Sequence, residues 1–228
     1  SLIICTYMRP RAILKLLQSV SEQTLYPNEI VVIDGSANDD TETILNQKEY
    51  KNLYYCKVDK INRGLTKQRN FGIEKVSKNS DIICFLDDDT ILEPTYFENL
   101  IKTYSEKPDA LAVGGYITNE VLWQKEVVPK DKSHFYYDGW QRTEPLRFKI
   151  RRYFGLLPDV SPGFMPSFSH GRSISFLPPS NRIYEVEQLM GGVSSYKKEI
   201  LKILSSEDID EACSLRSEMS WASGELGV

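Results

Sequence analysis

Three consecutive carboxylates, Asp87, Asp88 and Asp89, are the residues whose type and spacing most directly suggest chemistry. They follow the apolar run Ile82–Leu86, which is typical of a strand buried on both faces. Adjacent acids repel one another and are poor core residues, so something must compensate their charge. Ligands bind at the carboxyl ends of strands in open α/β sheets, and hard divalent cations take carboxylate and phosphate oxygens. The stretch therefore predicts a metal site for a phosphorylated ligand, with an acidic solvated turn as the alternative.

The elements that must position these acids alternate along the first half of the chain. Short apolar runs predict strands, and apolar residues at helical spacing predict helices. The expected strands are 1–6, 29–34, 53–57, 82–86 and 110–116, and the expected helices are 10–20, 41–47, 65–77 and 93–104. This alternation predicts an α/β fold with a mixed, mostly parallel sheet flanked by helices.

The composition changes near residue 117. From 118 to 179 aromatic, basic, proline and glycine residues are frequent and periodicity is weak. A loop-rich region of that length predicts a lid or binding segment, or partial disorder. Order is expected to return over 186–203, where Gly191 and Gly192 precede a short strand and a helix that begins at Lys197.

Charge and cysteine usage exclude several classes of protein. A net charge of −4 argues against nucleic-acid binding, which usually requires a basic surplus. The four cysteines form no CxxC pair and the two histidines are far apart, so reduced thiols are expected and a zinc site is not. No apolar run approaches the roughly 20 residues of a membrane span. The chain begins at Ser1 in what already reads as a strand, so we expect it to be part of a longer protein.

One segment of the second half combines positive charge with bulky apolar residues. Arg147–Leu157 reads RFKIRRYFGLL. Such a mixture predicts peripheral contact with an anionic membrane surface. The alternative is an amphipathic helix packed against its own domain.

Five motifs occur in the order SLIICTYMRP, VVIDGSANDDT, NRGLTKQRNFGI, FLDDDT and LMGGVSSYKKEIL. Together they resemble the family 2 glycosyltransferases, which are inverting enzymes with a GT-A (nucleotide-diphospho-sugar transferase) fold. The resemblance covers most of 1–115 and returns at 186–204. It implies a Rossmann-like GT-A fold in one domain over 1–228, with a nucleotide-sugar-binding half at 1–116 and an acceptor-binding half at 117–228.

The resemblance also implies roles for individual residues. The expected nucleotide-binding residues are Thr6, Tyr7, Arg9, Asp34, Arg69, Asn70, Asp87 and Asp88. Among them Asp34 would accept a hydrogen bond from the base, and Asp87 would lie near the ribose. Gln68 departs from the alanine usual in the family, and Asp88 stands at the variable position of the acidic motif. Asp89 would coordinate Mn²⁺ or Mg²⁺.

The implied reaction is a metal-assisted single displacement with inversion. A sugar moves from a nucleotide-diphosphate donor, with a UDP-sugar expected, to a hydroxyl of a glycan or lipid-linked acceptor. Gly191 and Gly192 would let the sugar or acceptor approach the backbone, with a simple turn as the alternative. Asp208 in Glu207-Asp208-Ile209-Asp210 best matches the catalytic base, although it follows the glycine pair sooner than in the family. We therefore expect missing residues around 204–207. The alternative to a catalytic role is that Glu207 and Asp208 lie in the first turn of a helix capped by Ser206.

Several other classes of protein are alternatives to this hypothesis. A haloacid-dehalogenase-type phosphatase is disfavoured because Ile91 follows Thr90 and several strand–helix units precede the acids. The sequence contains neither the GxGxxG motif of dinucleotide-binding enzymes after its first strand nor the GxxxxGK(S/T) motif of P-loop enzymes, so both classes are disfavoured. A catalytically inactive nucleotide-sugar-binding or scaffold protein on the same fold stays open. The expected location is cytoplasmic, at the inner face of the membrane, in the synthesis of cell-envelope polysaccharide.

Overall fold

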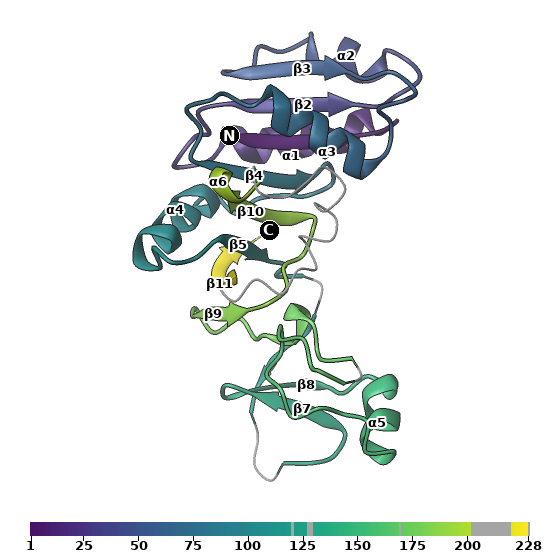
Figure 1. Ribbon diagram of the computed structural model, residues 1–228, viewed down its shortest axis with the longest axis vertical. Helices are drawn as coiled ribbons and strands as arrows, with labels where there is room; N and C mark the ends of the chain where they lie inside the picture. Colours follow the sequence, from purple (N-terminus) through teal and green to yellow (C-terminus); the bar gives the residue numbers. More distant parts are fainter. Residues whose placement is uncertain (120, 127–129, 169, 202–219, 228) are drawn as a thin grey trace.

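The computed structural model describes residues 1–119, 121–126, 130–168, 170–201 and 220–227 of the chain. Within these residues the main feature is an eight-stranded sheet with the order β3-β2-β1-β4-β10-β5-β11-β9 (Figure 1). Its strands are β1 (Leu2–Thr6), β2 (Ile30–Asp34), β3 (Leu53–Lys57), β4 (Ile82–Asp87), β5 (Ala112–Tyr116), β9 (Ile183–Val186), β10 (Val193–Lys197) and β11 (Ser220–Gly227). Strands β10 and β9 oppose the direction shared by the others, which confirms the mixed, mostly parallel sheet.

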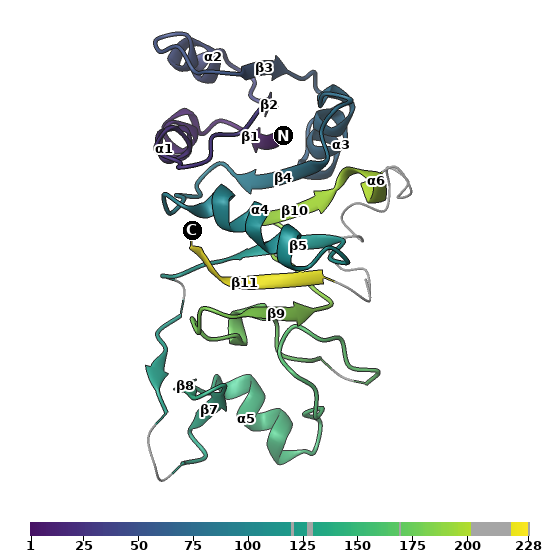
Figure 2. The same ribbon diagram turned by 90° about the vertical axis from the view of Figure 1, so that its left-hand side faces the viewer.

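Helices cover both faces of this sheet, and this explains why the central strands are apolar throughout. One face packs against α1 (Pro10–Ser21), α2 (Asp40–Leu45) and α4 (Tyr96–Glu106), and the other against α3 (Leu65–Lys75) and α6 (Lys198–Leu201) (Figure 2). Alternate residues of β1 divide between the two cores, with Leu2 and Ile4 in one and Ile3 in the other. The period of two along a strand produces this division. The predicted strand–helix alternation of the first half is confirmed.

Helix α3 packs against the sheet at a glycine, Gly72. A Cβ added to Gly72 would lie 2.7 Å from Cγ2 of Ile3 on β1. A larger residue would push the helix away from the strand ends. Since the first turns of α3 face the carboxyl ends of β1 and β2, this contact helps to place the residues discussed below.

The region expected to be loop-rich contains more regular structure than the sequence pattern indicated. It forms a three-stranded antiparallel sheet of β6 (Gln124–Lys125), β8 (Trp140–Thr143) and β7 (His134–Tyr137), with α5 (Leu146–Tyr153) and the short 3-10 helix η1 (Ile174–Phe176). This distal unit lies at the end of the molecule away from β3 (Figure 1). Strands of two to four residues are too short to display a period, so the sequence could not reveal them.

The distal unit has an aromatic interior built around a buried ion pair. The rings of Phe148 and Phe176 lie 4.8 Å apart, and those of Phe135 and Phe176 lie 5.4 Å apart. Arg172 lies over these rings and pairs with the buried carboxylate of Glu144 at 3.2 Å. Burial lowers the pKa of Arg172, and the Glu144 carboxylate opposes that shift. Removing either partner of such a buried pair would leave an uncompensated charge and destabilise the unit.

The strand expected after Gly191 and Gly192 is confirmed as β10, and the helix after it as α6. What the sequence did not predict is its position, because β10 inserts antiparallel between β4 and β5 in the middle of the sheet. The insertion brings the Gly192 carbonyl to 2.9 Å from the backbone N–H of Asp87. The glycine pair therefore lies directly beside the acidic residues at the end of β4.

Candidate active site

The charge of the acidic triplet is compensated by side chains from two other elements. Asp88 is buried, and its carboxylate accepts hydrogen bonds of 2.7 Å from Thr6 Oγ1 and from Arg9. The other guanidinium nitrogen of Arg9 lies 2.8 Å from Asp89 Oδ2, so one arginine bridges two of the three acids. Burial raises the pKa of Asp88, while the bond from Thr6 and the charge of Arg9 oppose that rise. Asp88 thereby ties the end of β1 to the end of β4.

Asp87 is held by α3 and by the glycine pair before β10, and not by the loop after β1. Its Oδ1 lies 3.3 Å from Nη2 of the buried Arg69, which also donates a 2.7 Å hydrogen bond to the Gly191 carbonyl. A Cβ added to Gly192 would lie 2.3 Å from Asp87 Oδ2. Position 192 therefore requires glycine if the Asp87 carboxylate is to keep this position.

A first cavity of about 590 Å³ opens between β1 and β4. It is lined by Cys5, Thr6, Tyr7, Arg9, Arg63, Gly64, Leu65, Gln68, Asp87, Asp88 and Asp89. The chain leaves β1 toward β2 on one side and returns through β3 and α3 to β4 on the other. The cavity therefore lies at the topological switch point of the sheet, where α/β proteins bind their ligands.

A second cavity of about 400 Å³ lies on the other side of the acids. It is lined by Asp87, Asp89, Thr90, Ile91, Ile117, Asn119, Met190, Gly191, Gly192 and Val193. Asp87 and Asp89 thus belong to both cavities. A ligand that extends from one cavity into the other must pass these two carboxylates.

The loop after β1 has a strained backbone that is fixed by the neighbouring loop. Met8 has a φ of 56°, in the left-handed region that side chains other than glycine seldom adopt. Its N–H donates a 2.8 Å hydrogen bond to Ser36 Oγ, and the Ser36 N–H donates to Asp34 Oδ1 at 2.7 Å. Strain of this kind gathers at ligand sites. Here it directs Tyr7, which is exposed, and Arg9 toward the first cavity.

Asp34 lies at the end of β2 but does not line either cavity. Its carboxylate is fully buried and accepts a 2.8 Å hydrogen bond from the Tyr55 hydroxyl in addition to that from Ser36. Burial and the bond to Asp34 raise the pKa of Tyr55. In this structure Asp34 therefore organises the loop, and its contact with a base stays a prediction that requires the Tyr55 side to open.

In the sequence Gln68 is only a departure from the family pattern, but in the structure its side chain links α3 to two strands. Its buried side-chain amide donates to the Thr6 carbonyl at 3.0 Å and to the Ile33 carbonyl at 2.9 Å. It therefore ties α3 to the ends of β1 and β2, which an alanine cannot do. Arg63 and Leu65 also line the first cavity and were not singled out from the sequence.

Asn70 is half-buried on α3 and lines neither cavity. Asp208 lies outside the described residues, so its role as base stays a prediction.

The donor set suits a hard divalent cation that takes most of its ligands from a bound molecule. Asp87 and Asp89 offer only carboxylate oxygens, which are what Mg²⁺ and Mn²⁺ prefer. In the part of the chain that the structure describes, no three His, Cys, Asp or Glu residues converge on one point to enclose an ion. Asp89 already binds a cation, the guanidinium of Arg9. These residues fit a metal held by one or two carboxylates plus phosphate oxygens.

The sheet order and the acids at its switch point define a GT-A-type fold, the class found in nucleotide-sugar transferases. Residues 1–172 match the model of glycosyl transferase family 2, and the chain belongs to that family.

Three curated relatives illustrate the family's range. The glucosyl-dolichyl phosphate glucuronosyltransferase of Haloferax volcanii is 29% identical over 138 residues, 58% of this chain and 42% of the relative. The O-antigen chain rhamnosyltransferase RfbN of Salmonella typhimurium is 32% identical over 117 residues, which are 50% of this chain and 36% of the relative. The poly(ribitol-phosphate) β-N-acetylglucosaminyltransferase TarP of Staphylococcus aureus is 33% identical over 119 residues, which are 51% of this chain and 36% of the relative. The matches span less than half the length of these relatives.

Solved structures confirm the fold. Residues 1–349 of S. aureus TarS give a TM-score of 0.57 at 15% identity, over 99% of this chain and 58% of that one. GalNAc-T7 gives a TM-score of 0.55 at 14% identity, over 99% of this chain and 42% of that one. The mannosyltransferase PcManGT of Pyrobaculum calidifontis gives a TM-score of 0.53 at 16% identity, over 90% of this chain and 46% of that one.

The contact between Tyr55 and Asp34 leads to a prediction about stability. Tyr55→Phe removes a donor from a fully buried carboxylate and should lower the free energy of unfolding by about 1–3 kcal/mol. Urea denaturation would measure the loss. Tyr54→Phe on the same strand is the matched control, since Tyr54 is exposed, and it should change stability by less than about 0.5 kcal/mol. Equal effects of the two changes would contradict the assigned role of Asp34.

Proposed function

We propose that this chain is an inverting glycosyltransferase that transfers a sugar from a nucleotide-diphosphate donor, with a UDP-sugar expected, to a hydroxyl. The observation that supports this most directly is the arrangement of two cavities that share Asp87 and Asp89 at the carboxyl end of β4. A donor has two chemically different ends joined by a diphosphate. The nucleotide would occupy the first cavity, the sugar would lie in the second, and the diphosphate would pass the shared carboxylates.

The first cavity offers suitable groups for the nucleotide end. Tyr7 is exposed at its rim and can stack on a base, and Arg9 and Arg63 supply positive charge for phosphate. Thr6 and Gln68 hold the floor in place through their bonds to Asp88 and to the ends of β1 and β2. Neighbours of the same fold were solved with nucleotides: TarS with UDP, PcManGT with GDP-Man and Mn²⁺, and GalNAc-T7 with UDP, GalNAc and Mn²⁺. They support the proposal of a nucleotide donor and of Mn²⁺ or Mg²⁺ at Asp89.

The chemistry divides among the residues of this chain. The acceptor hydroxyl attacks the anomeric carbon as the bond from that carbon to the diphosphate oxygen breaks, and Asp208 takes the hydroxyl proton. Arg69 fixes the Asp87 carboxylate, and the Gly191-Gly192 backbone leaves room for the sugar. A bound divalent cation would supply Lewis-acid stabilisation of the charge on the departing diphosphate. A single displacement of this kind inverts the anomeric centre.

We place the acceptor among glycans and lipid-linked sugars, at the cytoplasmic side of a membrane. The names of three relatives contain glucosyl-dolichyl phosphate, O-antigen chain and poly(ribitol-phosphate), all large or lipid-linked acceptor types. The open second cavity can receive the end of such a molecule. A nucleotide-sugar-binding protein without turnover is the competing hypothesis, and acceptor-dependent release of UDP separates the two.

The decisive experiment is calorimetric titration with UDP, GDP and UDP-sugars, with and without Mn²⁺. We expect one nucleotide to bind in a Mn²⁺-dependent way, and Asp89→Ala to weaken that binding by more than about tenfold. Glu93→Ala is a control that removes an exposed carboxylate near the same loop but outside both cavities. A folded wild-type protein that binds no nucleotide under any of these conditions would overturn the proposal.

The close contact at Gly192 provides a second test of the same site. Gly192→Ala forces the Asp87 carboxylate to move and should weaken nucleotide binding by about tenfold, equivalent to about 1.4 kcal/mol. Gly191→Ala is the matched control, because its Cβ would lie an ordinary 3.5 Å from the nearest atom, Nη1 of Arg69. Calorimetry with unfolding curves on both variants would show whether binding changes without loss of the fold. Unchanged binding in Gly192→Ala would show that Asp87 does not contact the donor.

The proposed base can be separated from the binding groups. Asp208→Asn should leave UDP binding unchanged and lower the rate of sugar transfer by about 10²–10⁴-fold, the usual contribution of a general base. Release of UDP in the presence of acceptor would be the measurement, and Asp210→Asn would be the control. If Asp210→Asn abolishes transfer and Asp208→Asn does not, the base is assigned to the wrong residue.

A further inference from the structure

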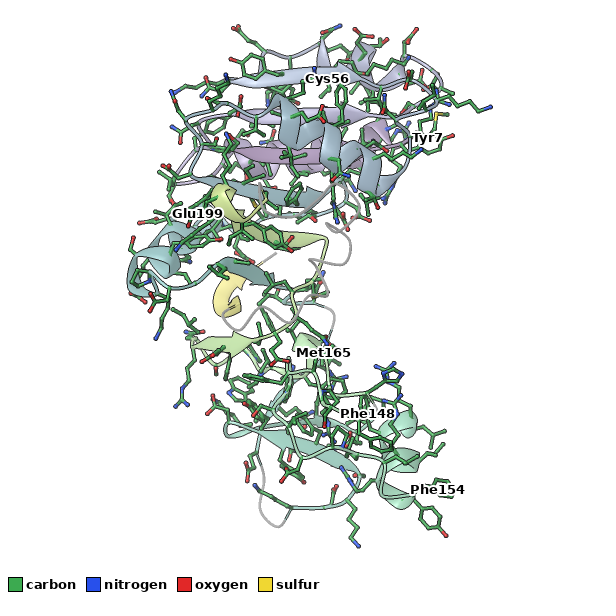
Figure 3. The ribbon with its side chains drawn as sticks, in the orientation of Figure 1. Tyr7, Cys56, Phe148, Phe154, Met165 and Glu199 are labelled. Atoms are coloured by element: carbon green, nitrogen blue, oxygen red, sulfur yellow. The ribbon has the colours of Figure 1, made fainter. Side chains whose placement is uncertain are left out.

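Helix α5 presents its apolar side chains outward instead of toward the protein. Only Phe148 among its residues is buried, whereas Leu146 is 71% exposed, Ile150 49% and Tyr153 84%. Phe154, the next residue, is 66% exposed. The helix packs against its own domain through Phe148, as the alternative expected, but its other apolar side chains face outward. Figure 3 shows Phe154 at the outer edge of the molecule.

The exposed apolar residues lie on one face of the helix. Successive residues turn by about 100°, so Leu146, Ile150, Tyr153 and Phe154 fall within one sector of about 100°, opposite Phe148. A solvated helix normally shows the reverse arrangement, with its apolar face inward. A contiguous outward apolar face on a folded domain indicates an interaction surface.

Positive charge borders this face on both sides. Arg147 and Lys149 flank the apolar sector, and Arg151 lies next to Arg147 on the helix surface. Residues 146–157 contain four basic residues and no acidic one, in a chain whose net charge is −4. Arg152 pairs with the buried Glu144, but in the described part of the chain no ion pair holds Arg147, Lys149 or Arg151. The α5 surface is defined here as Leu146, Ile150, Tyr153 and Phe154 with Arg147, Lys149 and Arg151.

We propose that the α5 surface docks the protein on an anionic lipid bilayer. Basic residues that border exposed aromatic and aliphatic side chains match a bilayer surface, where the cations meet lipid phosphates and the apolar groups enter the headgroup boundary. The eight residues of α5 rise about 12 Å, so the helix lies along the membrane and does not span it. Among the described residues no helix is long and apolar enough to cross a membrane.

The position of this surface also bears on the acceptor. Tyr7, at the rim of the first cavity, and Phe154 lie on the same side of the molecule in Figure 3. A bilayer against α5 would therefore face the side on which the candidate active site opens. This consequence, an acceptor carried on the membrane, rests on the proposed function, whereas the docking itself does not.

Co-sedimentation with vesicles tests the docking directly. The wild-type protein should bind vesicles of mixed phosphatidylglycerol and phosphatidylcholine, and much more weakly those of phosphatidylcholine alone. Replacing Arg147, Lys149 and Arg151 by Gln should weaken binding by about 100-fold, at about fivefold for each cation near the surface. Tyr153→Ser with Phe154→Ser should weaken it by about tenfold or more. All these side chains are at least partly exposed, but Arg147 and Arg151 also lie over the buried ring of Phe148, so unfolding curves are measured for each variant and only folded variants are compared.

Matched controls change the same chemistry elsewhere on the molecule. Lys15, Lys60 and Lys102, all exposed, are replaced together by Gln to give the same change in net charge. Tyr54→Ser with Ile101→Ser removes one exposed aromatic and one exposed aliphatic residue from the first half of the chain. Both controls should bind vesicles as the wild type does.

Several outcomes would overturn the proposal. They are absence of wild-type binding, equal binding to neutral vesicles, and equal loss in the α5 variants and the controls. Self-association that only the α5 variants abolish, without vesicle binding, would assign the surface to a second copy of the chain. Nucleotide titration on the same variants keeps the two proposals apart, because failure of docking with intact UDP binding leaves the transferase proposal standing. Asp89→Ala should bind vesicles normally.

Discussion

Mutual repulsion among Asp87, Asp88 and Asp89 is the constraint on which the rest of this structure depends. Three adjacent carboxylates at a strand end are stable only if cations and hydrogen-bond donors from elsewhere reach them. Thr6 and Arg9 come from the end of β1 and the loop that follows it, and Arg69 comes from α3. Satisfying the acids therefore brings together three parts of the chain that are distant in sequence. The same contacts leave Asp87 and Asp89 at the junction of two cavities.

The negative charges of the three acids are compensated by different partners, and the three side chains therefore play different parts in the site. Asp88 is buried and engaged on both oxygens, which makes it a tie between strands. Among the described residues Asp89 pairs with Arg9 alone, and the side chain of Arg9 is half exposed and can move. Asp87 is positioned jointly by Arg69 and by the bare backbone of Gly192. A buried central acid between two more exposed ones can hold a charged ligand in a fixed geometry.

The distal unit follows a different physical logic from the main sheet. Its interior contains aromatic rings packed around Arg172 and the buried Glu144. From α5, Phe148 enters that interior and Arg152 pairs with Glu144. The outward face of the helix is available to a partner, and its cations and exposed rings suit an anionic bilayer.

The sequence by itself determined the order and type of the elements in the first half and the family of the protein. Continuous apolar runs such as Ile82–Leu86, and helical stripes such as that of α1, reflect local periods that burial imposes on the chain. The acids at the end of β4 and the glycine pair before β10 were also visible, since their chemistry is unusual wherever they fold. Their roles in binding and catalysis remain predictions.

Tertiary structure alone decided which of these residues meet. The insertion of β10 between β4 and β5 places Gly192 against Asp87, and no local pattern encodes a pairing between segments so far apart. The bonds of Gln68 to two strand ends, the enclosure of Asp34 by Tyr55 and Ser36, and the short strands of the distal unit are likewise non-local. The outward direction of the apolar face of α5 belongs with them. A helical period shows that a face exists, but only packing decides whether that face is buried.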